Sequence, residues 1–188
     1  MLKLYEVGIF PLWEATSQEQ RNAWSHGWLS IGTLNIQGIL ASGLDGFGVV
    51  SLNLSRSKLS GIISPALANI QSLRVLDLSS NNMTGPIPPQ LGNNLHNLEI
   101  LSLFENSLNG TIPPSLGNLS NLSELLLYSN DLSGTIPLEI GLLKKLKVLR
   151  VGDNNLTCHI LEEISKCTEL RLMGFGSSLN GSIPITFG

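Results

Sequence analysis

The sequence predicts an α/β solenoid, a right-handed coil of about six stacked repeats with a parallel sheet on its concave side and short 3₁₀ turns on its convex side. The first observation is a pattern, Leu-x-Leu-x-x-Asn-x-Leu-x-Gly-x-Ile-Pro, which begins at Leu125 and, with Met83 in one leucine position, at Leu76. A further copy begins at Leu101, and looser copies begin at Leu52 and Leu149. Repetition at such a period is the sequence signature of a solenoid.

The second observation is the regularity of the period. The residues that occupy the glycine position of the pattern recur every 23–25 residues: Gly61, Gly85, Gly110, Gly134, Cys158 and Gly181. The longest interval contains the doubled Asn93-Asn94. A repeat this regular predicts coils of nearly equal length that stack side by side.

Each part of the pattern predicts one element of a coil. The two leucines two apart lie on one face of a short strand, because side chains alternate along a strand, and stacked copies make a parallel sheet with about 4.8 Å between strands. The asparagine after the second leucine turns inward, where its amide must bond neighbouring backbone groups. Four asparagines then stack as a ladder: Asn81, Asn106, Asn130 and Asn154.

The second half of the pattern carries the chain to the convex side. Glycine permits the turn off the strand, and proline restricts how the backbone continues. The segment that follows, such as 115–119, places leucines three apart, which fits one 3₁₀-like turn.

These residues resemble the plant-specific class of leucine-rich repeats, whose consensus is LxxLxLxxNxLxGxIPxxLGxLxx. The resemblance covers residues 49–188, and the string Leu-Arg-Val-Gly-Asp-Asn at 149–154 is similar to one in the Gassho group of receptor kinases. The class builds the extracellular domains of plant receptor-like kinases and receptor-like proteins, and the secreted polygalacturonase inhibitors. The resemblance therefore implies a leucine-rich repeat coil that recognises a peptide or protein outside the cell.

The resemblance also divides the chain. Residues 1–23 are unassigned and contain no evident signal peptide, because charges and a proline interrupt their apolar run. Residues 24–48 stand where the family has an N-terminal cap of the form Cys-x-Trp-x-Gly-Val-x-Cys. Here Trp24 and Gly27 remain without the two cysteines, so we expect a degenerate cap. Residues 49–188 hold the repeats, and the lack of a terminal cap leads us to expect an array truncated at its C-terminal end.

Composition excludes several classes of function. The net charge is −3 and no basic block is present, so we expect no binding to nucleic acid, and contact with a membrane only through a segment absent from this chain. No cofactor or metal site is indicated, and no acid–base pair, so the chain is expected not to be an enzyme. Cys158 and Cys167 are interpreted as two free thiols, although a disulfide between them stays open.

Seven Asn-x-Ser/Thr sequons are the main sequence evidence for the secretory pathway and for the extracellular side of the plasma membrane. An Asn- and Ser-rich repeat can also generate sequons by chance. Asn53 lies on a predicted concave strand, where a glycan would block a ligand, so we do not expect it to be used. The expected glycosylation sites are Asn82, Asn109, Asn118, Asn121, Asn155 and Asn180.

The concave face of the sheet is the candidate ligand-binding surface. By the period, Phe104, Leu126 and Tyr128 lie near one another on it, with charged residues around them. An apolar patch with a charged rim is typical of a peptide or protein site, but an ordinary solvated sheet face is an equally open alternative. The residues predicted to bind are Asp77, Phe104, Glu105, Leu126, Tyr128, Arg150 and Asp153. The same face is predicted to present Ser79 and Ser102.

Three functions remain open at this point. The first is the recognition module of a plant receptor-like kinase, which binds an extracellular peptide or a partner ectodomain such as a co-receptor; the family's kinase domain would then lie beyond this chain. The second is a secreted inhibitor of a cell-wall-degrading enzyme. The third is a truncated product without activity, which the degenerate cap and Leu161 in the usual proline position suggest.

Overall fold

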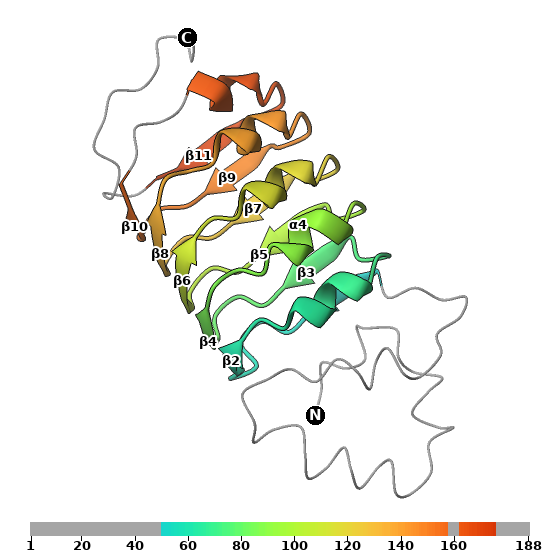
Figure 1. The fold of residues 1–188 in the computed structure, drawn as a ribbon, viewed down its shortest axis with the longest axis vertical. Coiled ribbons are helices and arrows are strands. Elements are labelled where there is room, and N and C mark those ends of the chain that lie inside the picture. The colour runs from blue at the N-terminus through green and yellow to red at the C-terminus, as the bar shows by residue number, and fades with distance from the viewer. Residues whose placement is uncertain (1–49, 158–161, 176–188) are drawn as a thin grey trace, which may run out of the picture.

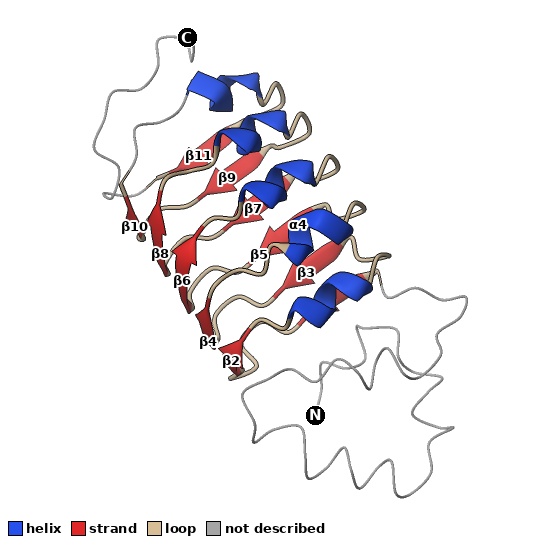
Figure 2. Cartoon of the chain, viewed as in Figure 1, coloured by secondary structure: helices blue, strands red, loops and turns tan. Residues whose placement is uncertain are grey.

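The computed structural model describes residues 50–157 and 162–175, which form a stack of coils in sequence order (Figure 1). The predicted N-terminal segment and cap, Cys158, Leu161, Asn180 and the last repeat lie outside these residues. Each coil runs through a strand of one sheet, a short strand of a second sheet, and a helical turn, and then returns to the first sheet (Figure 2).

The first sheet is parallel and six-stranded, in the order β1-β3-β5-β7-β9-β11. In register, Leu76 pairs with Leu101, Leu101 with Leu125, and Leu125 with Leu149, and all four side chains are fully buried. The predicted solenoid and its aligned leucine row are therefore confirmed. The strands are β1 (Ser51–Asn53), β3 (Val75–Asp77), β5 (Ile100–Ser102), β7 (Glu124–Leu126), β9 (Val148–Arg150) and β11 (Leu172–Gly174).

A second parallel sheet, in the order β10-β8-β6-β4-β2, follows the asparagine ladder and was not predicted. The Asn-x-Leu-x-Gly segments that form this sheet were expected to be turns only. The leucine of each segment, such as Leu132, points inward and is buried in the core, which holds the segment in place beside its neighbours. Strand β8 of this sheet, for example, ends at Gly134, whose positive φ (+76°) is a conformation that a side chain disfavours. The strands are β2 (Ser60–Ile62), β4 (Asn82–Gly85), β6 (Ser107–Thr111), β8 (Asp131–Gly134) and β10 (Asn155–Leu156).

The convex side carries one helical turn per coil. Four turns are 3₁₀, as predicted: η2 (Pro65–Asn69), η3 (Pro114–Asn118), η4 (Leu138–Leu142) and η5 (Glu162–Lys166). The fifth, α4 (Gln90–Asn94), is α-helical, with bonds from the Asn93 N–H to the Pro89 carbonyl and from the Leu95 N–H to the Leu91 carbonyl. The difference from the prediction arises because the Asn93-Asn94 pair adds one residue to this repeat. The wider α-helical turn accommodates that residue, so the chain still returns to the first sheet in register.

A glycine in the convex turn sets how closely two coils approach. A Cβ on Gly117 would lie 2.3 Å from the carbonyl oxygen of Glu139 in the next coil, and a Cβ on Gly92 would lie 2.3 Å from the carbonyl of Ser115. Real Cβ atoms do not come this close to backbone atoms. These glycines therefore fix the spacing of the turns, and hence the relative positions of the strands on the concave side.

Candidate functional site: the concave sheet

The asparagine ladder holds the ends of the concave strands in place. Asn130 is buried, and its Nδ2 donates to the carbonyls of Leu103 and Leu127 at 3.0 and 3.1 Å, while its Oδ1 accepts from the Leu108 N–H at 3.0 Å. Each amide thus joins its own coil to the preceding one, and no buried amide end lacks a partner. Asn81, Asn106 and Asn154 make equivalent bonds.

The residue before each ladder asparagine adopts a left-handed backbone conformation. At Glu105 and Asp153 φ is +52°, a conformation that side chains rarely adopt and that persists only where the surroundings impose it. Here the N–H of Glu105 still donates to the carbonyl of Tyr128, at 3.0 Å, so inter-coil bonding continues through the turn. Both carboxylates are exposed at the strand ends, and that of Glu105 accepts from the Ser80 hydroxyl at 2.7 Å.

An aromatic stack occupies the centre of the concave face. The rings of Phe104 and Tyr128 lie 4.5 Å apart between centroids and are nearly parallel, at 7°. The guanidinium carbon of Arg150 lies 4.0 Å from the centroid of the Tyr128 ring. Because Phe104 comes from the coil before Tyr128 and Arg150 from the coil after it, the ring is held on both faces. We call Phe104, Tyr128 and Arg150 the concave stack.

Two glycines let Arg150 take this position. Arg150 belongs to the strand row of Leu126 and Gly174, two residues earlier along the chain than the row of Tyr128. The next coil has Gly152 in the Tyr128 row, so no side chain competes for the second face of the ring. A Cβ on Gly174 would lie 3.3 Å from Cγ of Arg150, so Gly174 also keeps the arginine side chain free of a close neighbour.

The other residues predicted to bind a ligand are partly buried or hydrogen-bonded within the chain. Leu126 is half-buried beside the stack. Asp77 is also half-buried, and its Oδ1 accepts from the backbone N–H and the hydroxyl of Ser79, at 3.0 and 2.6 Å, so half of this carboxylate is committed within its own coil. Ser79 and Ser102 are buried, with 2% and 4% of their surface exposed, so the prediction that the concave face presents them was wrong.

The structure brings together part of the predicted set and separates the rest. Leu126 on β7 and Arg150 on β9 lie beside Phe104 and Tyr128, which follow β5 and β7 by two residues. Asp77 is bonded within its own coil, and the two exposed carboxylates lie past the strand ends. Sequence reasoning missed that Arg150 leaves its row to cover Tyr128. The signal was present, because Gly152 stands where the period otherwise places Ser79, Phe104 and Tyr128.

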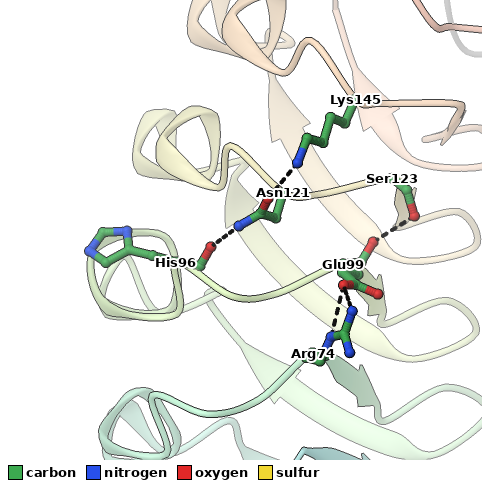
Figure 3. A network of polar contacts seen from close by, with 6 residues as sticks. All are labelled: Arg74, His96, Glu99, Asn121, Ser123 and Lys145. Carbon is green, nitrogen blue, oxygen red and sulfur yellow. Dashed lines mark hydrogen bonds and ion pairs between the residues drawn. The ribbon is translucent and has the colours of Figure 1, made fainter.

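A polar network occupies the return from the convex turns to the strands (Figure 3). Lys145 donates to the Asn121 Oδ1 at 2.8 Å, and Asn121 donates to the carbonyl of His96 at 2.9 Å. Arg74 forms an ion pair with Glu99, and the Ser123 hydroxyl donates to the Glu99 carbonyl at 3.0 Å. These contacts join consecutive coils and give Asn121 a structural role.

The predicted glycosylation sites differ in exposure. The side chains of Asn82, Asn109, Asn118 and Asn155 are exposed, whereas Asn121 is half-buried and bonded at both ends of its amide. Asn53 is half-buried on β1, with its Oδ1 accepting from the Ser55 N–H at 3.0 Å.

Cys167 is a free thiol buried beneath η5, and its Sγ donates to the Ile140 carbonyl at 3.2 Å. Burial raises the pKa of this thiol above its ordinary value of 9.0, against a smaller opposing effect of the Lys144 ammonium. The thiol therefore stays neutral and packs as a small apolar group, which suits a structural role rather than a reactive one.

Within residues 50–157 and 162–175 no group of acidic, cysteine and histidine side chains could hold a metal. No helix in the same residues is long and apolar enough to cross a bilayer.

The chain is similar to several known proteins. A family model described as Leucine Rich Repeat matches residues 48–70, 72–94, 97–119 and 121–143. A putative leucine-rich repeat receptor-like serine/threonine-protein kinase of Arabidopsis thaliana is 49% identical over 45 residues, 24% of this chain and 5% of the relative.

Solved structures extend this similarity over most of the chain. The ectodomain of the plant membrane receptor kinase GASSHO1/SCHENGEN3 from Arabidopsis thaliana, in complex with CASPARIAN STRIP INTEGRITY FACTOR 2, is 36% identical with a TM-score of 0.69, and the match covers 77% of this chain and 20% of that one. The ectodomain of the Arabidopsis receptor kinase HAESA, in complex with an N-terminally extended IDA peptide hormone ligand, is 38% identical with a TM-score of 0.65, covering 69% and 22%. This chain thus spans about a fifth of either ectodomain. From the repeat pattern, the stacked sheets and these similarities, we conclude that the chain belongs to the leucine-rich repeat proteins, in the class carried by plant receptor-like kinases.

Proposed function

We propose that this chain is the ligand-recognition part of a plant receptor-like kinase ectodomain, and that it binds an extracellular peptide or a partner ectodomain through its concave sheet. The concave stack is the observation that carries this proposal. Tyr128 is held on both faces and therefore loses little side-chain freedom on binding, and an aromatic residue of this kind at the centre of a surface is a typical binding hot spot.

The dimensions of the sheet favour an extended peptide. Six parallel strands at about 4.8 Å span roughly 24–29 Å, which is the reach of about seven or eight extended residues. The similar ectodomains of GASSHO1/SCHENGEN3 and HAESA have been solved in complexes with another molecule, a peptide hormone in the case of HAESA. A co-receptor ectodomain is the second partner that we propose for the same role in signalling.

We propose no catalytic activity for this chain. The relative that is named as a kinase is matched over 5% of its length, and the family model that matches this chain describes repeats. The activity in its name therefore does not carry over to the repeats, whose part in such a protein is recognition.

An extracellular location is part of the proposal, and the four exposed sequons support it. Asn118 and Asn121 offer a matched pair, because both stand in the sequence Asn-Leu-Ser three residues apart. We expect a glycan on Asn118 and none on Asn121 in the folded, secreted protein, because a glycan on Asn121 would displace its bonds to Lys145 and His96. Glycopeptide mass spectrometry of the full chain secreted from plant cells measures both occupancies. Absence of glycan from every sequon would contradict the proposed location.

Peptide display tests the proposed function. The full chain, immobilised, is used to select from a library of random peptides of about eight residues, and each enriched peptide is then measured against Tyr128→Ala. We expect binding to fall by 10-fold or more, because truncating a hot-spot residue removes at least about 1.4 kcal/mol. Ser129→Ala, a change at the neighbouring half-buried residue, is the control and should leave binding within about threefold. Selection of no peptide that depends on Tyr128 would contradict the proposal.

A further inference from the structure

We propose that Arg150 is the specificity-determining residue of the concave face, and that it selects a peptide carrying an aspartate or glutamate side chain within an extended segment. This inference rests on the proposed function and names the chemistry of its ligand. It follows from three properties of Arg150: its missing counter-charge, its fixed position, and the open surface beside it.

The charge of Arg150 is not matched by an acidic partner in the described part of the chain. Arg74 pairs with Glu99 and Lys147 pairs with Glu169, but no ion pair forms at Arg150. The four positions around Arg150 on the sheet are neutral: by register and sequence they are Leu126, Gly174, Val148 and Gly152. The acidic Glu124 lies diagonally to Arg150 on β7, in register with Val148, but forms no ion pair with it. An exposed guanidinium without an ion-pair partner keeps much of its attraction for an incoming anion.

The position of Arg150 is fixed by the ring beneath it. A free arginine side chain loses much rotamer freedom when it binds, whereas a guanidinium already held 4.0 Å above the Tyr128 ring has lost part of it. Arginine presents its N–H groups in a planar fork that matches the two oxygens of a carboxylate. The face against Tyr128 is covered, so the fork is available from the solvent side of the concave face.

The surroundings favour a carboxylate inside a chain over one at its C-terminal end. Gly174 lies opposite Arg150 on β11, and Gly152 follows Arg150 two residues along its own coil. Neither residue carries a side chain, so neither position obstructs a peptide backbone that continues past the arginine. In the other direction Phe104 lies two strands away, roughly 10 Å, which is about three extended residues. The ligand therefore presents an apolar residue near the rings and an acidic residue over Arg150.

The exposed carboxylates set the register of the ligand. Glu105 and Asp153 lie past the strand ends, one residue after the row of Phe104, Tyr128 and Gly152 and three residues after the row of Arg150. They repel an acidic side chain placed there, so the favourable position for a carboxylate is confined to the row of Arg150.

Positional peptide selection tests this inference. The probes are two libraries of random peptides of about eight residues, one with a free C-terminus and one amidated, both selected on the full chain and on Arg150→Gln. We expect Asp or Glu to be enriched in both libraries on the wild type. We expect Arg150→Gln to abolish that enrichment and to weaken the selected peptides by 10- to 100-fold, the usual loss for a charge-assisted hydrogen bond.

Three controls keep the outcome specific. Arg171→Gln removes the same charge from another exposed arginine and should change affinity by less than about twofold in 150 mM salt. Arg150→Lys keeps the charge without the planar fork and should give an intermediate loss. Circular dichroism melting checks that each variant stays folded, as expected for an exposed side chain.

The outcomes separate this inference from the proposed function. Peptides that depend on Tyr128 but show no acidic preference, or whose affinity survives Arg150→Gln, overturn the role of Arg150 and leave the proposed function in place. Enrichment of acidic residues only in the library with the free C-terminus overturns the assignment to a side chain. Recovery of no peptide that depends on Tyr128 overturns both.

Discussion

The interior of the coil and the concave face share the same strands but follow different rules. Along the interior, Leu76, Leu101, Leu125 and Leu149 repeat one side chain in register, because stacked identical layers fill the space between coils. On the face, the rows change residue at every coil, as from Ser79 to Phe104 to Tyr128 to Gly152. The comparison shows that the period specifies the scaffold, while departures from it specify the surface on which recognition depends.

The largest expected effect separates two adjacent residues. Leu127 is fully buried and Tyr128 is partly exposed, so Leu127→Ala should lower the free energy of unfolding by about 2–5 kcal/mol, the usual cost of a core truncation. Tyr128→Ala should lower it by about 1 kcal/mol or less, which is the usual value of an aromatic pair. Urea unfolding followed by circular dichroism measures both. Equal decreases in the free energy of unfolding would mean that Leu127 and Tyr128 do not lie on opposite sides of the chain, one in the core and one on the concave face.

The asparagine ladder belongs to the interior even though its residues are polar. Asn130→Ala should cost about 3 kcal/mol, because it leaves the carbonyls of Leu103 and Leu127 and the Leu108 N–H without their partner in a buried site. The matched control is Asn109→Ala, an exposed asparagine one coil earlier, which should change stability by less than about 0.5 kcal/mol. Urea unfolding of both variants makes the measurement, and a loss at Asn109 as large as that at Asn130 would contradict the ladder's role.

Two glycines provide a further comparison between the packed scaffold and the concave face. Gly117→Ala places a Cβ 2.3 Å from a backbone oxygen of the next coil and should cost about 1–3 kcal/mol, as overpacking does. Gly174→Ala meets only the flexible side chain of Arg150, at 3.3 Å, and should change stability by less than about 0.5 kcal/mol. It should nevertheless weaken peptide binding, because the arginine must shift. Thermal melting and peptide affinity together measure the two effects, and a greater loss of stability at Gly174 would reverse the assignment.

Most of the fold, but only part of the site, followed from the sequence. The solenoid, the leucine row and the four 3₁₀ turns were predictable because every coil repeats the same local rule. The second sheet was not, since the pattern of Asn-x-Leu-x-Gly is as compatible with a turn as with a strand of two to five residues. The α-helical turn α4 follows from the extra residue at 93–94 only once the closure of the coil is known.

The site was harder to predict because it depends on contacts between rows. The period placed Phe104 and Tyr128 in neighbouring coils, and the structure stacks them. The period could not show that the Arg150 side chain reaches the Tyr128 ring, because this position depends on the absence of side chains at Gly152 and Gly174. The period also placed Ser79 and Ser102 on the face without showing that both side chains are buried.

The smallest expected effect concerns Cys167, an interior residue whose contribution depends on pH. Its folded pKa is raised above 9.0 by burial, so the folded state favours the neutral thiol and the unfolded state ionises first as the pH rises. The stability that the neutral thiol contributes is therefore fully present below pH 9.0 and is lost progressively above it. Cys167→Ser keeps a donor for the Ile140 carbonyl but does not ionise in this range.

The difference in Tm between the wild type and Cys167→Ser isolates this contribution. Thermal melting under reducing conditions at pH 7, 8.5 and 10 should show a constant difference at the two lower values and a smaller advantage for the wild type at the highest. A difference that stays constant up to pH 10 would mean that Cys167 is accessible to water, and would move it from the interior to the surface.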